Sequence, residues 1–151
     1  MFRYPPGSPR QRSDRQRGAA AVEFALIVPL LLSLLLGVID FGMAFGQYVS
    51  LQGAAREAAR QGIVLGDVVA SANTAKGVLD SSKLEVRFAV DVTAGAPGVM
   101  VVCLRYPRTS LTGFFNWTLN GHFQTKALMR MEGTALVTAG LKSWTGGLCT
   151  K

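Results

Sequence analysis

The sequence is poor in the residue types from which metal centres and catalytic sites are commonly built. Its 151 residues include one histidine, His122, and two cysteines, Cys103 and Cys149. One imidazole excludes any site that needs two, and two cysteines are too few for a multi-cysteine zinc site or a disulfide-built miniature fold. The sequence also lacks a Gly-rich phosphate loop, a Ser–His–Asp set and a carboxylate pair at catalytic spacing. We therefore expect no enzymatic activity, no cofactor and no metal.

Charge is also scarce. Charged residues make up 17% of the chain, against about 25% in an ordinary soluble domain, while hydrophobic residues reach 49%. This balance excludes a disordered protein, which combines low hydrophobicity with high charge. The length suits one modest domain plus one further element. The 16 basic and 9 acidic residues give a net charge of +7.

The basic residues are concentrated at the start of the chain. Residues 1–18 carry one acid, Asp14, and five arginines: Arg3, Arg10, Arg12, Arg15 and Arg17. Three prolines and two glycines in this stretch predict that it forms no regular helix. A nucleic-acid partner is not expected, because neither interleaved aromatics nor a groove-reading helix accompanies the basic arm.

A long apolar run follows. Phe24–Tyr48 is 25 residues with Asp40 as its one charge, enough for about 37 Å of helix where a bilayer core needs about 30 Å. Leu30–Leu36 is apolar on all sides, whereas a soluble helix would show a polar face. We expect a transmembrane helix over about residues 24–48. The preceding arginines place its N-terminus in the cytoplasm and the rest of the chain outside, by the positive-inside rule.

Helical character continues beyond the apolar run to Gly62, so one helix is expected over residues 19–62. Pro29 removes one backbone hydrogen bond and can kink or locally melt this helix. Four alanines form a stripe that another backbone can approach closely, either this chain's own sheet or another helix: Ala54, Ala55, Ala58 and Ala59.

Residues 63–151 are expected to form an extracytoplasmic α+β domain. Leu84–Val92 and Phe123–Glu132 alternate between apolar and polar, as half-buried strands do, and Val99–Tyr106 is apolar on both faces, as a central strand is. These runs predict a three- to four-stranded antiparallel sheet packed on the helix. We expect a helix or turn over 67–79, a helix or loop over 111–117, a tight turn at 120–121, and a loose tail or an edge strand over 133–151.

A carboxylate stands at the entrance to the apolar run. If the chain were cut after Gly18, Ala19 would gain a largely cationic α-amino group. Glu23 lies four residues further on, on the same face of a helix, and could pair with this amine or with that of a neighbouring subunit. The alternative is that Glu23 merely lies among the lipid headgroups.

These residues resemble the TadE-like family, minor pilin-like proteins (pseudopilins) of the bacterial tight-adherence (Tad), or type IVc, pilus system. The sequence that carries the resemblance is RGAAAVEFAL over residues 17–26, then Pro29, Asp40 and AAREAAR over residues 54–60. The resemblance implies that a prepilin peptidase cuts after Gly18 and that Glu23 is the carboxylate of the processing motif. Other pilins, pseudopilins and an inner-membrane assembly platform are the implied partners. Phe24 departs from the Glu–Tyr pair of the major pilins, and the long outer domain suits an accessory subunit.

Three residues remain open at this point. Asp40 either faces protein, water or a proton, or lies near the outer headgroups. Cys103 and Cys149 either form a disulfide, which the extracytoplasmic side permits, or leave Cys103 buried and free. We expect His122 to be an exposed turn residue.

Two other functions fit the same features. The chain could be an uncleaved membrane anchor that carries a periplasmic binding module. It could also be a secreted protein whose signal sequence ends at Ala44 after Gly42–Met43, although the apolar stretch is longer than usual for a signal peptide. The leading interpretation is a single-pass inner-membrane protein that acts by helix packing in pilus formation or adhesion.

Overall fold

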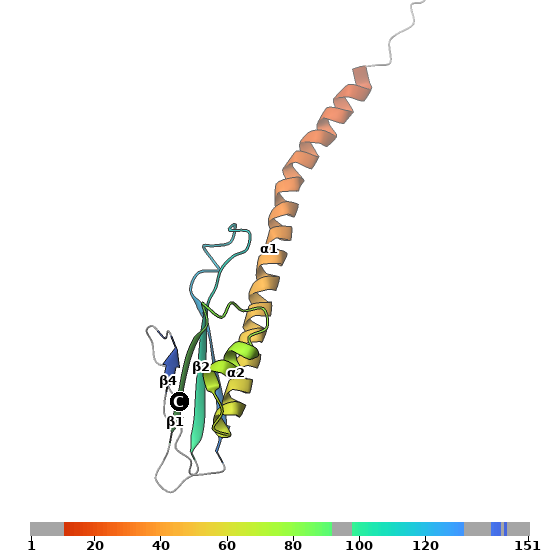
Figure 1. Cartoon of the computed structure of the whole chain (residues 1–151). Helices are drawn as coiled ribbons and strands as arrows, with labels where there is room; N and C mark the ends of the chain where they lie inside the picture. Colours follow the sequence, from red (N-terminus) through yellow and green to blue (C-terminus); the bar gives the residue numbers. More distant parts are fainter. Residues whose placement is uncertain (1–10, 92–97, 132–139, 143, 145–151) are drawn as a thin grey trace, which may run out of the picture. The chain divides into compact units, whose positions relative to one another are not determined.

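The computed structural model describes residues 11–91, 98–131, 140–142 and 144. The elements are α1 (Gln11–Ile63), α2 (Val68–Thr74), β1 (Glu85–Asp91), β2 (Val99–Pro107), β3 (His122–Arg130) and β4 (Gly140–Lys142). They fall into two compact units, divided between Ile39 and Asp40, and α1 contributes to both. Figure 1 shows these elements along the chain.

Helix α1 begins earlier than the sequence predicts. Residues 11–18 are helical, although the stretch 1–18 was expected to form no regular helix. The physical reason is that its prolines, Pro5, Pro6 and Pro9, all precede Gln11, and Gly18 weakens a helix by only about 1 kcal/mol. The helix also continues through Pro29.

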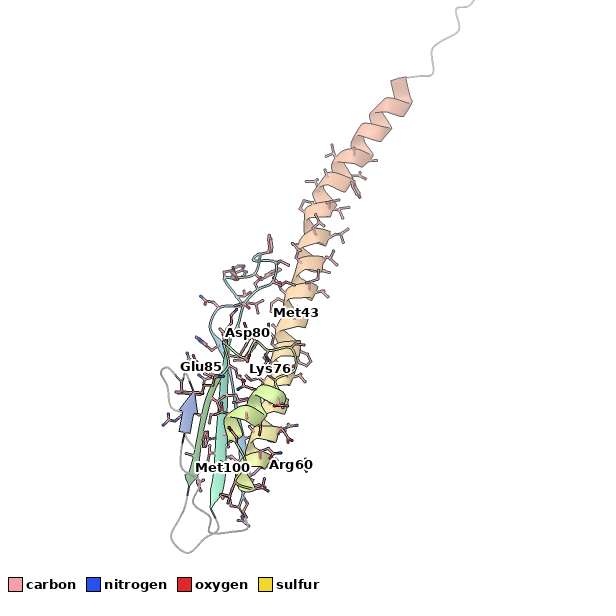
Figure 2. All side chains as sticks on the ribbon, viewed as in Figure 1. Met43, Arg60, Lys76, Asp80, Glu85 and Met100 are labelled. Carbon is pink, nitrogen blue, oxygen red and sulfur yellow. The ribbon has the colours of Figure 1, made fainter. Side chains whose placement is uncertain are left out.

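The end of α1 differs in a similar way. Gly62 was expected to stop the helix, but it lies inside α1, and the chain turns at Leu65, whose φ is 62°. The amide of Gly66 then donates to the Gln61 carbonyl over 2.9 Å. Gly62 has a packing role instead, because a Cβ there would lie 2.7 Å from Cε of the buried Met100. Figure 2 shows Met100 and Arg60 at the same end of the domain.

The sheet has the order β3-β2-β1-β4, and all its strand pairs are antiparallel. Strand β2 is central, as its apolar faces predict. Phe88, Val102 and Ala127 form one row across β1, β2 and β3. Gly140 of β4 lies opposite Phe88, where a Cβ would come within 2.5 Å of the ring. The α+β class with a small antiparallel sheet is therefore confirmed.

The core lies between the sheet and the two helices. Val86 of β1, Leu104 of β2 and Leu51 of α1 are fully buried in it, and so is Leu84, which directly precedes β1. The alanine stripe completes the helix side, with each alanine 0–1% exposed: Ala54, Ala55, Ala58 and Ala59. The structure thus places the stripe against this chain's own core, where the small side chains let the helix backbone come close.

The connecting segments complete the domain. Asp67 caps α2 by accepting hydrogen bonds from the amides of Val69 and Ala70, both 2.9 Å long. Residues 111–117 form turns rather than a helix, and Gly121 has a φ of 109°, in line with the turn expected there. Strand β4 pairs with β1 within the segment expected to be a loose tail or an edge strand; residues 132–139, 143 and 145–151 lie outside the description.

Candidate functional site

The first unit carries an apolar helical surface over residues 22–39. Val28 and Leu36 are half-buried, and the other large apolar side chains from Val22 to Ile39 are 40–75% exposed: Val22, Phe24, Leu26, Ile27, Leu30, Leu31, Leu32, Leu34, Leu35, Val38 and Ile39. By length and composition, the stretch Gly18–Ile63 is one helix able to cross a membrane, and no part of its most apolar window is buried by protein. A helix that is apolar all round needs lipid or other helices around it. This surface fits a membrane anchor.

The four residues of the predicted processing site lie together at the start of this surface. Gly18, Ala19, Glu23 and Phe24 are all helical and exposed. The helix brings Ala19 and Glu23 to one face, one turn apart. A Cβ at Gly18 would meet no atom within 4 Å, so packing within the described structure does not require a glycine there.

Asp40 belongs to the second unit and faces protein. Its side chain is 1% exposed, although it is a carboxylate within an apolar sequence. Oδ1 accepts hydrogen bonds from the amides of Leu111 and Thr112, each 3.0 Å long. Oδ2 accepts hydrogen bonds from the hydroxyls of Ser110 and Thr112, each 2.6 Å long. Protein therefore surrounds this carboxylate, and its position relative to the outer headgroups stays a prediction.

The donors to Asp40 come from the connection between β2 and β3, residues 108–121, which we call the β2–β3 loop. The loop runs beside α1 beyond the end of the sheet (Figure 1). At its base the amide of Arg108 donates to the Gly121 carbonyl over 2.9 Å, and the Arg108 guanidinium donates to the Asn120 carbonyl over 2.7 Å. Leu119 is 6% exposed and turns inward. The loop is therefore fixed at its base and at Asp40.

Between these fixed points the β2–β3 loop presents large apolar side chains to the outside. Leu111 is 67% exposed, Phe114 is 56% exposed and Trp117 is 79% exposed. The Phe114 ring stacks edge-on against Phe115 at 5.0 Å, and Phe115 contacts Phe41 of α1 at 5.9 Å between ring centroids. Sequence reasoning missed this surface. The available signal was the run 110–121, which has no charged residue and three aromatic ones.

Arg105 joins two polar side chains of the sheet. Arg105 contacts Glu85 at 3.7 Å and Nδ1 of His122 at 3.1 Å. His122 is exposed but begins β3, so it is a strand residue rather than the turn residue expected. Within the described ranges, no three His, Cys, Asp or Glu side chains are grouped so as to hold a metal ion.

Cys103 is 2% exposed on β2 and forms a disulfide. Cys149, its predicted partner, lies outside the described residues. The pairing of Cys103 with Cys149 stays a prediction.

Comparison with known proteins bears on the helix alone. Residues 18–60 match the model of the family described as TadE-like protein. The match covers most of α1, under a third of the chain, and leaves the sheet outside it. No curated protein and no solved structure matches the chain.

Proposed function

From the TadE-like match over residues 18–60, we propose that the chain is a minor pilin-like subunit, or pseudopilin, of the Tad pilus machinery. The family is structural and associated with the Tad pilus. In this proposal the subunit is held in the bacterial inner membrane by α1, with its N-terminus in the cytoplasm and its sheet domain outside. It acts by helix packing and protein–protein assembly in pilus formation or adhesion, and not by catalysis.

The observation that carries the proposal is the contrast between covered and uncovered apolar side chains. The domain after Asp40 buries its own core, from Leu51 of α1 to Met131. Eleven large apolar side chains from Val22 to Ile39 are 40–75% exposed and have no such cover. Lipid covers them before assembly, and the apolar helices of other pilins and pseudopilins replace part of that lipid afterwards.

Processing supplies the register of this packing. A prepilin peptidase cuts after Gly18, where the open surroundings support selection of a glycine by the protease rather than by the fold. The freed Ala19 amine is largely cationic at neutral pH and pairs with Glu23 of the same helix or of a neighbour. Such a pair offsets the unfavourable placement of a carboxylate in a membrane helix.

The secreted alternative conflicts with the β2–β3 loop. Cleavage after Ala44 would remove Asp40 and leave the amides of Leu111 and Thr112 without their acceptor. These hydrogen bonds fix the loop to α1, so a chain that begins at Phe45 lacks the contact that holds the loop in its observed position. The geometry therefore favours a chain that keeps Asp40.

The N-terminus of the membrane-extracted protein tests this proposal. Intact mass and N-terminal sequencing are expected to give a start at Ala19. A start at Met1 would indicate the uncleaved anchor, and a start at Phe45 the secreted protein. Gly18→Leu is expected to retain the leader, whereas Gly46→Leu, at another open helix position, is expected to be processed normally.

A second experiment tests the register role of the carboxylate. Glu23→Ala is expected to reduce pilus output while the sheet domain stays folded. Glu57→Ala provides a matched control, because Glu57 lies on the same helix outside the apolar run and contacts Gln61 and Arg60. Normal piliation in the Glu23 variant would count against the register role.

A further inference from the structure

We infer that the apolar end of the β2–β3 loop, formed by Leu111, Phe114 and Trp117, is a second membrane contact that lies in the outer headgroup region. The inference rests on the proposed membrane anchoring by α1. It adds a site that the anchor alone does not imply: a part of the extracytoplasmic domain held in the lipid interface.

The β2–β3 loop is attached to α1 near the outer end of the proposed membrane span. A bilayer core takes about 20 helical residues at 1.5 Å each. Counted from Phe24, such a span ends at Met43, just after Asp40. Four hydrogen bonds fix the loop to Asp40, so the loop lies where the helix leaves the hydrocarbon.

The apolar surface of α1 continues onto the β2–β3 loop. Phe41 is 52% exposed on α1, and it contacts Phe115, which in turn contacts Phe114 of the loop. Phe45 follows one turn later and is 69% exposed. The exposed rings of the helix and of the loop therefore belong to one surface, and a medium that covers the first also reaches the second.

The composition of the β2–β3 loop suits a membrane interface. Residues 110–121 carry no charge, and aromatic side chains are enriched where membranes meet water, because tryptophan combines a large apolar ring with one N–H donor. Part of the loop backbone is already internally bonded. The amides of Thr118 and Leu119 donate to the Phe115 carbonyl, and that of Gly113 donates to the Ser110 hydroxyl. These groups keep their partners when the loop enters the lipid interface.

Fluorescence quenching in vesicles tests the inference on the full chain. Trp144→Phe leaves Trp117 as the sole tryptophan. The protein is reconstituted into phosphatidylglycerol–phosphatidylcholine vesicles whose phosphatidylcholine chains carry bromine near the headgroup end or near the methyl end. Trp117 is expected to lose most of its emission to the shallow bromines, less to the deep ones, and little to aqueous acrylamide.

Matched variants separate the loop from the rest of the domain. Leu128 is 50% exposed on β3, and Leu128→Trp in a chain without the natural tryptophans is expected to be reached by acrylamide and not by bromine. Leu111→Ser combined with Phe114→Ser is expected to weaken bromine quenching of Trp117, whereas Leu128→Ser leaves it unchanged. Hydrogen exchange of the β2 amides verifies that each variant is folded.

A probe in the anchor distinguishes failure of this inference from failure of the proposed function. Leu31→Trp, again as the sole tryptophan, is expected to be quenched by the deep bromines. If the anchor probe is quenched but Trp117 is open to acrylamide, the anchor stands and the loop contact is wrong. If Trp117 is shielded from both quenchers, a second copy of the protein covers it, which also overturns the inference. If neither probe meets bromine, the membrane anchor itself is wrong.

Discussion

One helix carries two contrasting surfaces, an uncovered apolar one that reaches Phe45 and a buried one that begins at Leu51. Before Asp40 its side chains are large and uncovered, as Leu31 and Leu34 show at 56% and 64% exposure. After Leu51 the buried positions are small, and Ala54 and Ala58 are fully covered by the domain. Helix formation is the same in both parts, so the difference lies in what each surface requires: large apolar side chains for contact with lipid, and small ones for close approach to the chain's own sheet.

The largest expected effect separates the covered surface from the uncovered one. Leu104→Ala removes a fully buried side chain from β2 and is expected to lower the free energy of unfolding of the domain by about 2–5 kcal/mol. Leu34→Ala makes the same chemical change at an exposed site and is expected to alter it by less than about 0.5 kcal/mol. Hydrogen exchange of the β2 amides in detergent measures both. Equal changes in the free energy of unfolding in the two variants would show that the exposed helix surface is buried like the core.

The complementary change acts on the membrane side. Leu31→Arg places a charge in the middle of the apolar run and is expected to oppose insertion by about 2.5–3.5 kcal/mol. The fraction of protein resistant to alkaline extraction from membranes should fall, while β2 exchange is unchanged. Leu128→Arg, on the exposed side of β3, should leave extraction unaffected. A loss of domain stability in the Leu31 variant would show that the two surfaces are not independent.

The boundary between the surfaces can be tested at Asp40 itself. Asp40→Ala removes an acceptor of four hydrogen bonds, so exchange of the Leu111 and Thr112 amides is expected to accelerate by about tenfold or more. Asp40→Asn keeps an oxygen for those amides, and the hydroxyls of Ser110 and Thr112 can rotate to accept from its amide group. We therefore expect a smaller change in the Asn variant. Similar exchange in both variants would mean that the shape of the side chain, and not its acceptors, fixes the loop.

The smallest effect concerns a helix that belongs wholly to the covered part. Asp67→Ala removes the cap of α2 and is expected to destabilise the domain by about 1 kcal/mol. Asp67→Asn retains a capping oxygen and should change stability much less. Urea unfolding, monitored by hydrogen exchange of the α2 amides, measures the difference in stability. An Asn variant that is destabilised as much as the Ala variant would contradict the capping role.

Periodicity was enough to predict the parts of the fold whose burial follows a simple pattern. The alternation from Leu84 onward predicts the buried face of β1, and the apolar run from Val99 predicts a central strand, because strand side chains alternate between faces. The alanine stripe likewise indicates close packing. In each case the signal is local, and the burial that it predicts is observed.

The missed features depend on contacts between distant residues. Asp40 and Thr112 are 72 positions apart, and no local pattern pairs them. Gly62 of α1 has the sequence features of a helix stop, but its role is to leave space for the side chain of Met100 from β2. The start of α1 was missed for a different reason: a proline restricts its own backbone and that of the preceding residue, so the prolines of residues 1–10 do not prevent a helix from Gln11 onward. Tertiary contacts, rather than local propensity, therefore determine the roles of Asp40 and Gly62.

The central claim is that the apolar part of α1 lies in a membrane while the chain after Asp40 folds on its own core. Sedimentation of the natural product, prepared from cells first without and then with detergent, tests it most directly. We expect the protein to stay with the membranes until detergent is added. In detergent, hydrogen exchange of the β2 amides should be slow. A protein that sediments as a free monomer in buffer without detergent would contradict the account.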